Sequence, residues 1–151
     1  MTIYFYAVQD EFGWLSNFSP HAVRVGKQKY ATVEHLFQSS KFLSAEDRAA
    51  VRQAKTPMLA ARMGRDRRRK LRRDWESAKR DVMLRGLRAK VEQHPELADA
   101  LLATGEERLV EHTANDTYWG DGGDGTGQNW LGRLWMQVRQ ELRDGGSRRH
   151  K

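Results

Sequence analysis

The sequence predicts one α+β domain that is mostly α-helical and carries a small β element. First, 151 residues are enough for one domain with a buried core but too few for two ordinary domains. Second, most of the chain shows apolar residues at helical spacing behind residues that commonly cap helices. Third, short runs of alternating or β-branched residues occur near the N-terminus and around residue 110.

The first thirty residues predict a strand, a loop and a hairpin. Residues 3–8 alternate and are rich in aromatic and β-branched side chains, which is typical of a strand. A loop follows over residues 11–20. Residues 22–25 and 29–31 then flank a turn at residues 26–28, a pattern that predicts a short hairpin leading into the first helix.

Capping residues and helix breakers predict the rest of the chain. The predicted caps are Thr32, Ser44, Thr56 followed by Pro57, and Asp74, and the chain breaks at His94-Pro95. Apolar residues recur at helical spacing between residues 82 and 91, where they indicate core. The expected helices cover residues 33–42, about 45–54, 57–64, the long stretch from 75 to the break, 96–103 and 131–142, with a strand at 108–112.

Composition and charge exclude several classes of function. The chain has no cysteine, which excludes a disulfide framework, a thiolate nucleophile and the usual structural zinc sites. No signal-peptide pattern opens the sequence and no apolar run approaches membrane-spanning length, so we expect a cytoplasmic protein without a membrane partner. The formal charge of +7 favours anionic partners such as phosphates, nucleotides or nucleic acid.

The helix that follows Thr32 carries the most chemistry. At 3.6 residues per turn, Glu34, Gln38 and Lys41 share one stripe, and a more apolar stripe overlaps it. Because Glu34 lies in the first turn, the helix dipole favours its ionised form. Taken alone, the stretch is interpreted first as an ordinary amphipathic helix with a chance Glu/Lys pair. The alternative is the centre of an active site.

Two loops and a basic run are further candidates for binding. Three aromatic side chains lie in residues 11–20, of which at least two are expected to fold onto the core, while one could face a planar ring. The glycine-rich residues 115–132 predict a tight loop. It lacks the βαβ unit of a dinucleotide site and the ligand spacing of a calcium loop, so no metal site is predicted. Residues 65–73 indicate a solvated face, with nucleic-acid binding as the alternative.

Carboxylates and one lysine provide candidate catalytic groups. Hydrolysis of a glycosidic bond needs one carboxylate to stabilise an oxocarbenium-like centre or activate water, and another group to protonate the leaving base. A buried lysine with a lowered pKa could instead form a Schiff base with the opened sugar. The spacing leaves both routes open. The acids are Glu34, Asp116, Asp121 and Asp124, with Lys41, Trp75 and Trp119 as candidate neighbours.

Motifs along nearly the whole chain occur in a characteristic order. They include residues 11–20, residues 32–38 with Lys41-Phe42, Asp116 with Trp119-Gly120, and residues 127–132. This order closely resembles the NADAR family, also called the YbiA-like family; the arginine density after Arg65 and the basic tail are mild departures. The resemblance implies a YbiA-like domain over residues 1–143 and a basic, disordered tail over residues 144–151.

The resemblance also implies an N-glycosidase that acts on a ribosylated nitrogen base without a cofactor. One implied substrate is ADP-ribosyl-guanine in DNA or RNA, which the positive charge slightly favours. The alternative substrate is a phosphoribosylamino pyrimidine from early riboflavin biosynthesis. A non-catalytic module that binds ADP-ribose or nucleotides is the alternative of a different class.

By analogy with the family, individual residues receive roles. Glu34 and Asp116 are the acid/base or charge-stabilising carboxylates, and Lys41 is the candidate for a covalent sugar intermediate. Arg65 is a phosphate contact. The implied substrate-binding residues are Phe12, Gly13, Ser16, Asn17, Phe18, His35, Gln38, Arg65, Trp75, Trp119, Gly120, Asp121 and Asn129.

Overall fold

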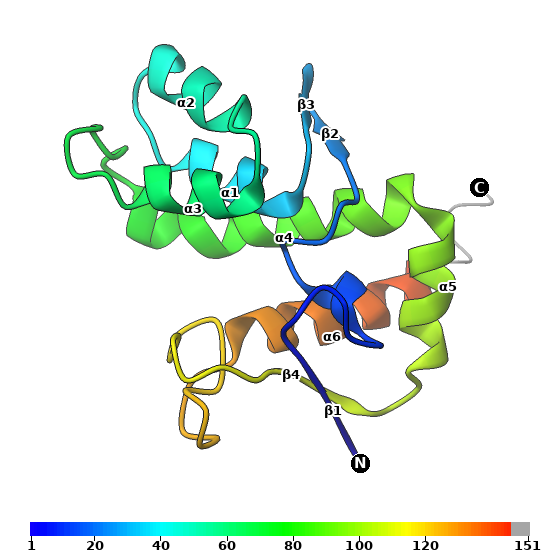
Figure 1. Cartoon of the computed structure of the whole chain (residues 1–151). Coiled ribbons are helices and arrows are strands. Elements are labelled where there is room, and N and C mark those ends of the chain that lie inside the picture. The colour runs from blue at the N-terminus through cyan, green and yellow to red at the C-terminus, as the bar shows by residue number, and fades with distance from the viewer. Residues whose placement is uncertain (146–151) are drawn as a thin grey trace. The chain divides into compact units, whose positions relative to one another are not determined.

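The computed structural model describes residues 1–145, which divide into two compact units. Unit 1 comprises Met1–Ser16 and the described residues from Val91 onward, and unit 2 comprises Asn17–Lys90. Helices outweigh two small two-stranded sheets, so the predicted mostly helical α+β fold is confirmed. The elements (Figure 1) are β1 (Thr2–Phe5), η1 (Gly13–Leu15), β2 (Val23–Val25), β3 (Gln28–Tyr30), α1 (Val33–Ser40), α2 (Ala45–Arg52), α3 (Pro57–Gly64), α4 (Trp75–Gln93), α5 (Pro95–Ala103), β4 (Arg108–Glu111) and α6 (Trp130–Gly145).

The predicted hairpin is confirmed in unit 2. Strands β2 and β3 are antiparallel and pair Val25 with Gln28, which leaves Gly26-Lys27 as the connecting turn. Gly26 has a φ of +61°, a conformation that favours glycine. Gln28 therefore belongs to the second strand, one residue earlier than the sequence pattern indicates.

The predicted caps of the next three helices are also confirmed. Thr32, Ser44 and Thr56 each accept a hydrogen bond from the backbone N–H three residues further on, at the N-termini of α1, α2 and α3. Asp74 precedes α4 as expected, but its two carboxylate oxygens accept hydrogen bonds from Arg72. A local ion pair thus accompanies the start of α4.

Helix α1 is buried along nearly its whole length, unlike an ordinary amphipathic helix. Val33 to Ser39 are all buried. The helix packs against α2 and α3 (Figure 1), and Gly86 of α4 lies against it as well. A Cβ atom at Gly86 would lie 3.0 Å from Leu36 and 3.1 Å from Val33. The polar side chains of α1 are consequently held inside unit 2, where their positions are fixed by packing.

Unit 1 combines the N-terminal segment with the C-terminal part of the chain. Strand β1 pairs in parallel with β4, with Thr2 opposite Arg108. It ends at Phe5, earlier than predicted, because its partner β4 ends at Glu111, opposite Phe5, and a turn follows in which Asp10 donates its backbone N–H to the Ala7 carbonyl. Helix α6 buries the predicted apolar positions Leu131, Leu134, Trp135 and Val138.

Helix α6 extends through residues 144 and 145, which the sequence assigned to the disordered tail, and the rest of that tail, residues 146–151, lies outside the described residues. Within residues 1–145, no helix combines the length and the apolar character that crossing a membrane requires.

Candidate functional site

Glu34 is a buried carboxylate in the first turn of α1. Its exposed fraction is 8%. Its backbone N–H donates to the Asn17 carbonyl at 3.1 Å, and its Oε2 accepts a hydrogen bond from Gln38 Nε2 at 2.7 Å. The two side chains are four residues apart, so they lie one above the other on the same helical face, as the spacing predicts. The amide of Gln38 therefore fixes the orientation of the Glu34 carboxylate.

Lys41 lies immediately after α1, on the same side as Glu34. Its Nζ donates to the Gly64 carbonyl at 3.4 Å and lies 5.7 Å from the centroid of the Phe37 ring. Burial lowers the pKa of the Lys41 amine, and the negative charge of Glu34 partly opposes this effect. Arg65 and Lys79 lower the pKa further. Lys41 is thus closer to a neutral amine than an exposed lysine would be.

Gly64, at the end of α3, positions two of these groups. A Cβ atom there would lie 1.8 Å from Gln38 Oε1, so only glycine allows the Gln38 amide to lie against this turn. The Gly64 carbonyl also accepts the Lys41 hydrogen bond. The sequence marked Gly64 only as a helix terminator, because a glycine shows no partner in its own pattern. Within residues 1–145, the buried Oε1 of Gln38 has no hydrogen-bond donor.

Aromatic and basic residues surround this cluster in unit 2. The Trp75 ring is buried and packs against Phe37 with 5.0 Å between ring centroids. Arg65 is exposed, and its charge acts on Lys41. Unit 2 therefore brings together five predicted site residues: Glu34, Gln38, Lys41, Arg65 and Trp75.

Both ring nitrogens of His35 are within hydrogen-bond distance of a partner in unit 2. Its Nδ1 lies 2.8 Å from Thr32 Oγ1, and its Nε2 lies 2.9 Å from the Ala54 carbonyl oxygen. Since a carbonyl only accepts, Nε2 carries a proton. The imidazole, 1% exposed, therefore joins α1 to Ala54, just after the end of α2.

In unit 1, Asp116 shapes the turn that carries Trp119. Its Oδ1 accepts hydrogen bonds from the backbone N–H groups of Tyr118 and Trp119 at 2.9 and 2.8 Å. The rings of Tyr118 and Trp119 meet edge to face with 4.9 Å between centroids. Gly120 follows in close contact with Thr113, because a Cβ atom there would lie 2.8 Å from its methyl group.

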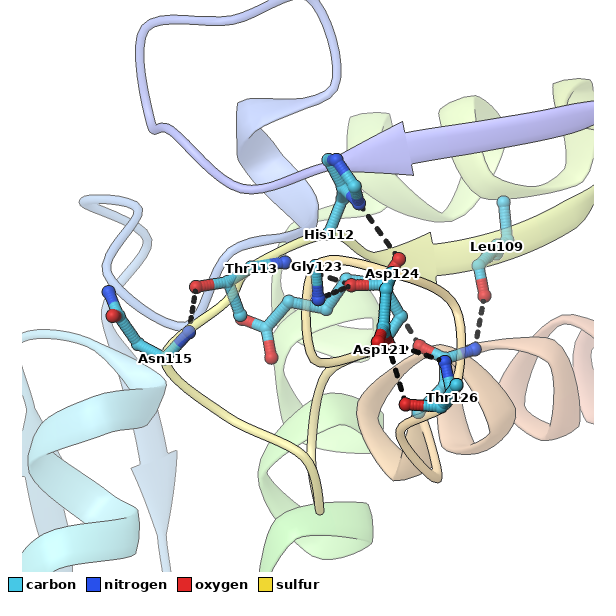
Figure 2. Close-up of polar contacts among 10 residues, drawn as sticks. Leu109, His112, Thr113, Asn115, Asp121, Gly123, Asp124 and Thr126 are labelled. Carbon is cyan, nitrogen blue, oxygen red and sulfur yellow. Dashed lines mark hydrogen bonds and ion pairs between the residues drawn. The ribbon is translucent and has the colours of Figure 1, made fainter.

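Asp121 and Asn129 hold the glycine-rich loop to β4. Asp121 accepts hydrogen bonds from the backbone N–H groups of Thr113 and Gly123, and its Oδ2 lies 2.8 Å from His112 Nδ1 (Figure 2). Burial acts to raise the pKa of Asp121, but these hydrogen bonds outweigh it and lower the pKa below its usual value. Asn129 bonds to the backbone of Leu109 and Glu111. Both side chains are engaged in shaping the loop.

The N-terminal loop is divided between the two units. In unit 1, Phe12 is half-buried, Ser16 is buried, and Gly13 lies so close to the Val8 carbonyl that a Cβ atom would be 1.9 Å from its oxygen. In unit 2, Phe18 is half-buried, and Asn17 donates from Nδ2 to Met83 Sδ at 3.4 Å. Among residues 1–145, no three His, Asp or Glu side chains are grouped so that they could hold a metal ion.

Comparisons with known proteins agree on one family. The profile of the NADAR domain matches residues 4–143. N-glycosidase YbiA of Escherichia coli strain K12 is 51% identical over 140 residues, which is 93% of this chain and 88% of that protein. The NMR structure of E. coli YbiA has a TM-score of 0.89 at 50% identity, covering 96% of this chain and 86% of that one. The riboflavin biosynthesis protein PYRR of Zea mays is 41% identical over 155 residues, 93% of this chain and 25% of that protein.

Proposed function

The chain belongs to the NADAR family, and on that basis we propose that it hydrolyses the bond between a ribose and a nucleobase nitrogen, with ADP-ribosyl-guanine in nucleic acid as its preferred substrate. The broader class, a hydrolase of N-glycosyl compounds, is supported by 51% identity to an N-glycosidase over 93% of the chain. The observation that carries the proposal is the buried Glu34 carboxylate, which Gln38 orients and whose charge acts on the half-buried amine of Lys41.

Glu34 is suited to stabilise positive charge at the sugar. When the bond between C1 and the base nitrogen breaks, its electrons leave with the base and C1 becomes oxocarbenium-like. When ionised, a carboxylate that is oriented by a donor amide can face that centre or activate the water that adds to C1. The departing base takes a proton from an acidic group. Asp116 is the candidate for this second role.

Lys41 offers a covalent alternative. Once the ring opens, a neutral amine can add to C1, displace the base amine and leave a Schiff base between C1 and Nζ. Water then hydrolyses the Schiff base and returns the lysine. A lowered pKa increases the neutral fraction of the amine, which this route requires.

The choice of substrate rests on charge and on relatives. A formal charge of +7 favours a polyanionic substrate such as modified DNA or RNA. The name of the Zea mays relative favours the second candidate, a phosphoribosylamino pyrimidine of riboflavin biosynthesis.

A side-by-side hydrolysis assay tests the proposal. We expect a higher kcat/KM on an oligonucleotide with ADP-ribosylated guanine than on phosphoribosylaminouracil. Glu34→Gln and Asp116→Asn should each slow base release by a factor on the order of a hundred or more. Glu46→Gln is the matched control, because Glu46 occupies the corresponding position in the first turn of α2 but is exposed.

Three results would contradict the proposal or its choice of substrate. Wild-type rates in both variants would remove the catalytic assignments. Tight ligand binding without turnover, unchanged in Glu34→Gln, would instead identify a non-catalytic binding module. Faster turnover of the pyrimidine would transfer the preference to the riboflavin intermediate.

A further inference from the structure

The basic loop, defined as residues 65–73, divides its cations into two groups. Three arginines form ion pairs that build the loop: Arg68 with Asp66, Arg69 with Asp47 of α2, and Arg72 with Asp74. In the described part of the chain, the other four cations have no carboxylate partner and are exposed; they are Arg65, Arg67, Lys70 and Arg73. The loop therefore carries an uncompensated positive charge on a surface that its own ion pairs hold in shape.

The backbone of the basic loop is fixed to the segment that follows the candidate catalytic helix. Arg72 donates its N–H to the Lys41 carbonyl at 2.8 Å, and Leu43 donates to the Lys70 carbonyl at 2.9 Å. Phe42 and Leu71 form a β-bridge between these hydrogen bonds. Most side chains of the run are exposed, as expected of a solvated face, and hydrogen bonds fix its backbone to the chain at Lys41 and Leu43.

An open cavity of about 450 Å³ lies at this junction. Three arginines, Arg48, Arg72 and Arg73, and one carboxylate, Asp74, which is paired with Arg72, line it together with Ser40, Phe42 and Leu43. Arg48 donates from one nitrogen to the carbonyls of Phe42 and Leu43, which fixes its guanidinium at the wall. Leu43 is 52% exposed and Leu71, on the bridge, is 49% exposed. The region thus offers cations and apolar side chains side by side.

We propose that the basic loop and this cavity bind the phosphates of a nucleic-acid strand that carries the modified base. Four exposed cations without a carboxylate partner in the described residues occur within nine residues, and such a density of positive charge favours the repeated phosphates of a strand. The exposed leucines can contact sugars or base faces. The inference rests on the proposed function, because it assigns the nucleic-acid substrate to a specific surface near Lys41.

A pair of double variants tests this surface. Lys70→Gln/Arg73→Gln removes two unpaired cations from the loop, and Lys27→Gln/Arg85→Gln removes one lysine and one arginine that are exposed elsewhere in unit 2. The readouts are kcat/KM on an ADP-ribosyl-guanine oligonucleotide and on ADP-ribosyl-guanosine, and the affinity for the unmodified oligonucleotide as a function of salt.

We expect the loop variant to lower kcat/KM on the oligonucleotide on the order of tenfold and to reduce the slope of log K against log salt by about 1.5, since each phosphate contact contributes about 0.7–0.9. Its activity on ADP-ribosyl-guanosine should not change. An equal loss in the control variant would show general attraction by net charge and would overturn the inference. An equal loss on ADP-ribosyl-guanosine would assign the cavity to the substrate's own phosphates and would also overturn it.

The affinity measurement separates the two proposals. If the wild-type protein hydrolyses neither modified substrate but the loop variant still binds unmodified oligonucleotide more weakly than the control variant, the surface is supported while the proposed substrate is wrong. If the wild type, the loop variant and the control variant have the same affinity for the oligonucleotide, the basic loop does not bind nucleic acid, whichever substrate the protein hydrolyses.

Discussion

At the scale of single residues, burial decides whether Lys41 can act as a nucleophile. Because burial lowers the pKa of its amine below the ordinary value of 10.5, a larger fraction of the amine is neutral than in an exposed lysine at the same pH. Borohydride added during turnover should therefore trap a protein–sugar adduct, detected by mass spectrometry. Lys41→Ala should give none, whereas exposed Lys29→Ala should give the wild-type amount. No adduct, together with an active Lys41→Ala variant, would remove the covalent route.

Lys90 gives a pH-dependent prediction about stability. It is 0% exposed, donates to Ser19 Oγ at 2.6 Å, and burial lowers its pKa to about 7. Between about pH 7 and 10.5 the unfolded chain binds this proton and the folded chain does not, so the free energy of unfolding should rise with pH by at most about 1.4 kcal/mol per unit.

Denaturant unfolding at several pH values checks this expectation. Lys90→Met should show a smaller rise with pH, because the contribution of Lys90 is gone, a chain of similar volume fills its place, and only the contribution of Lys41 remains. Exposed Lys29→Met serves as the control and should keep the wild-type dependence. Parallel curves for wild type and Lys90→Met would contradict the burial argument.

Residue spacing predicted local contacts but not distant ones. The pairing of Glu34 with Gln38 could be predicted, because residues four apart on a helix must lie together. The partners of Asp121 and Asn129 could not, since each bonds to backbone groups of the separate segment 109–113. The burial of Lys90 likewise depends on Ser19, far away in the sequence, and lysine is rarely a buried residue.

At the scale of elements, capping residues were the most informative signal for where helices begin. A capping side chain bonds to the backbone of its own helix, so its effect can be predicted from the local sequence. The capping threonines differ in the other contacts that they make. Thr32 accepts from the His35 backbone and lies 2.8 Å from its Nδ1, whereas Thr56 accepts only a backbone N–H at an exposed position. Strand β1 was harder to delimit, because its end depends on the turn at Ala7 and on its pairing with β4.

Thr32→Ala should therefore cost more stability than Thr56→Ala. Loss of a threonine cap costs about 1 kcal/mol, and a buried His35 nitrogen left without its partner adds about 1–3 kcal/mol. Midpoints of urea unfolding, compared at equal slope, measure the difference. Because α1 carries Glu34, Thr32→Ala should also lower activity at temperatures where the protein is still folded. Equal costs for the two variants would contradict the added role of His35.

At the scale of the whole molecule, unit 1 depends on contacts between the two ends of the described chain. β1 runs parallel to β4, and Trp135 of α6 donates from its indole to the Leu15 carbonyl at 2.9 Å. Neither contact has a signature in the sequence, because parallel pairing needs no short turn and a tryptophan at a buried helical position looks like any other core residue. Helical content could be predicted, whereas the way the ends close unit 1 could not.

Trp135→Phe tests that closure. It keeps an aromatic ring at a 0% exposed position but removes the donor to Leu15, and an unpaired buried carbonyl costs about 1–3 kcal/mol, with a further loss from the smaller ring. Trp130→Phe is the control, because its indole bonds to Gln128 at an exposed position and should cost less than about 1 kcal/mol. Both costs are measured by denaturant unfolding. If Trp135→Phe is no more costly than the control, the N-terminal segment does not depend on α6. A large cost accompanied by faster hydrogen exchange in β1 would show that one indole holds the two ends of unit 1 together.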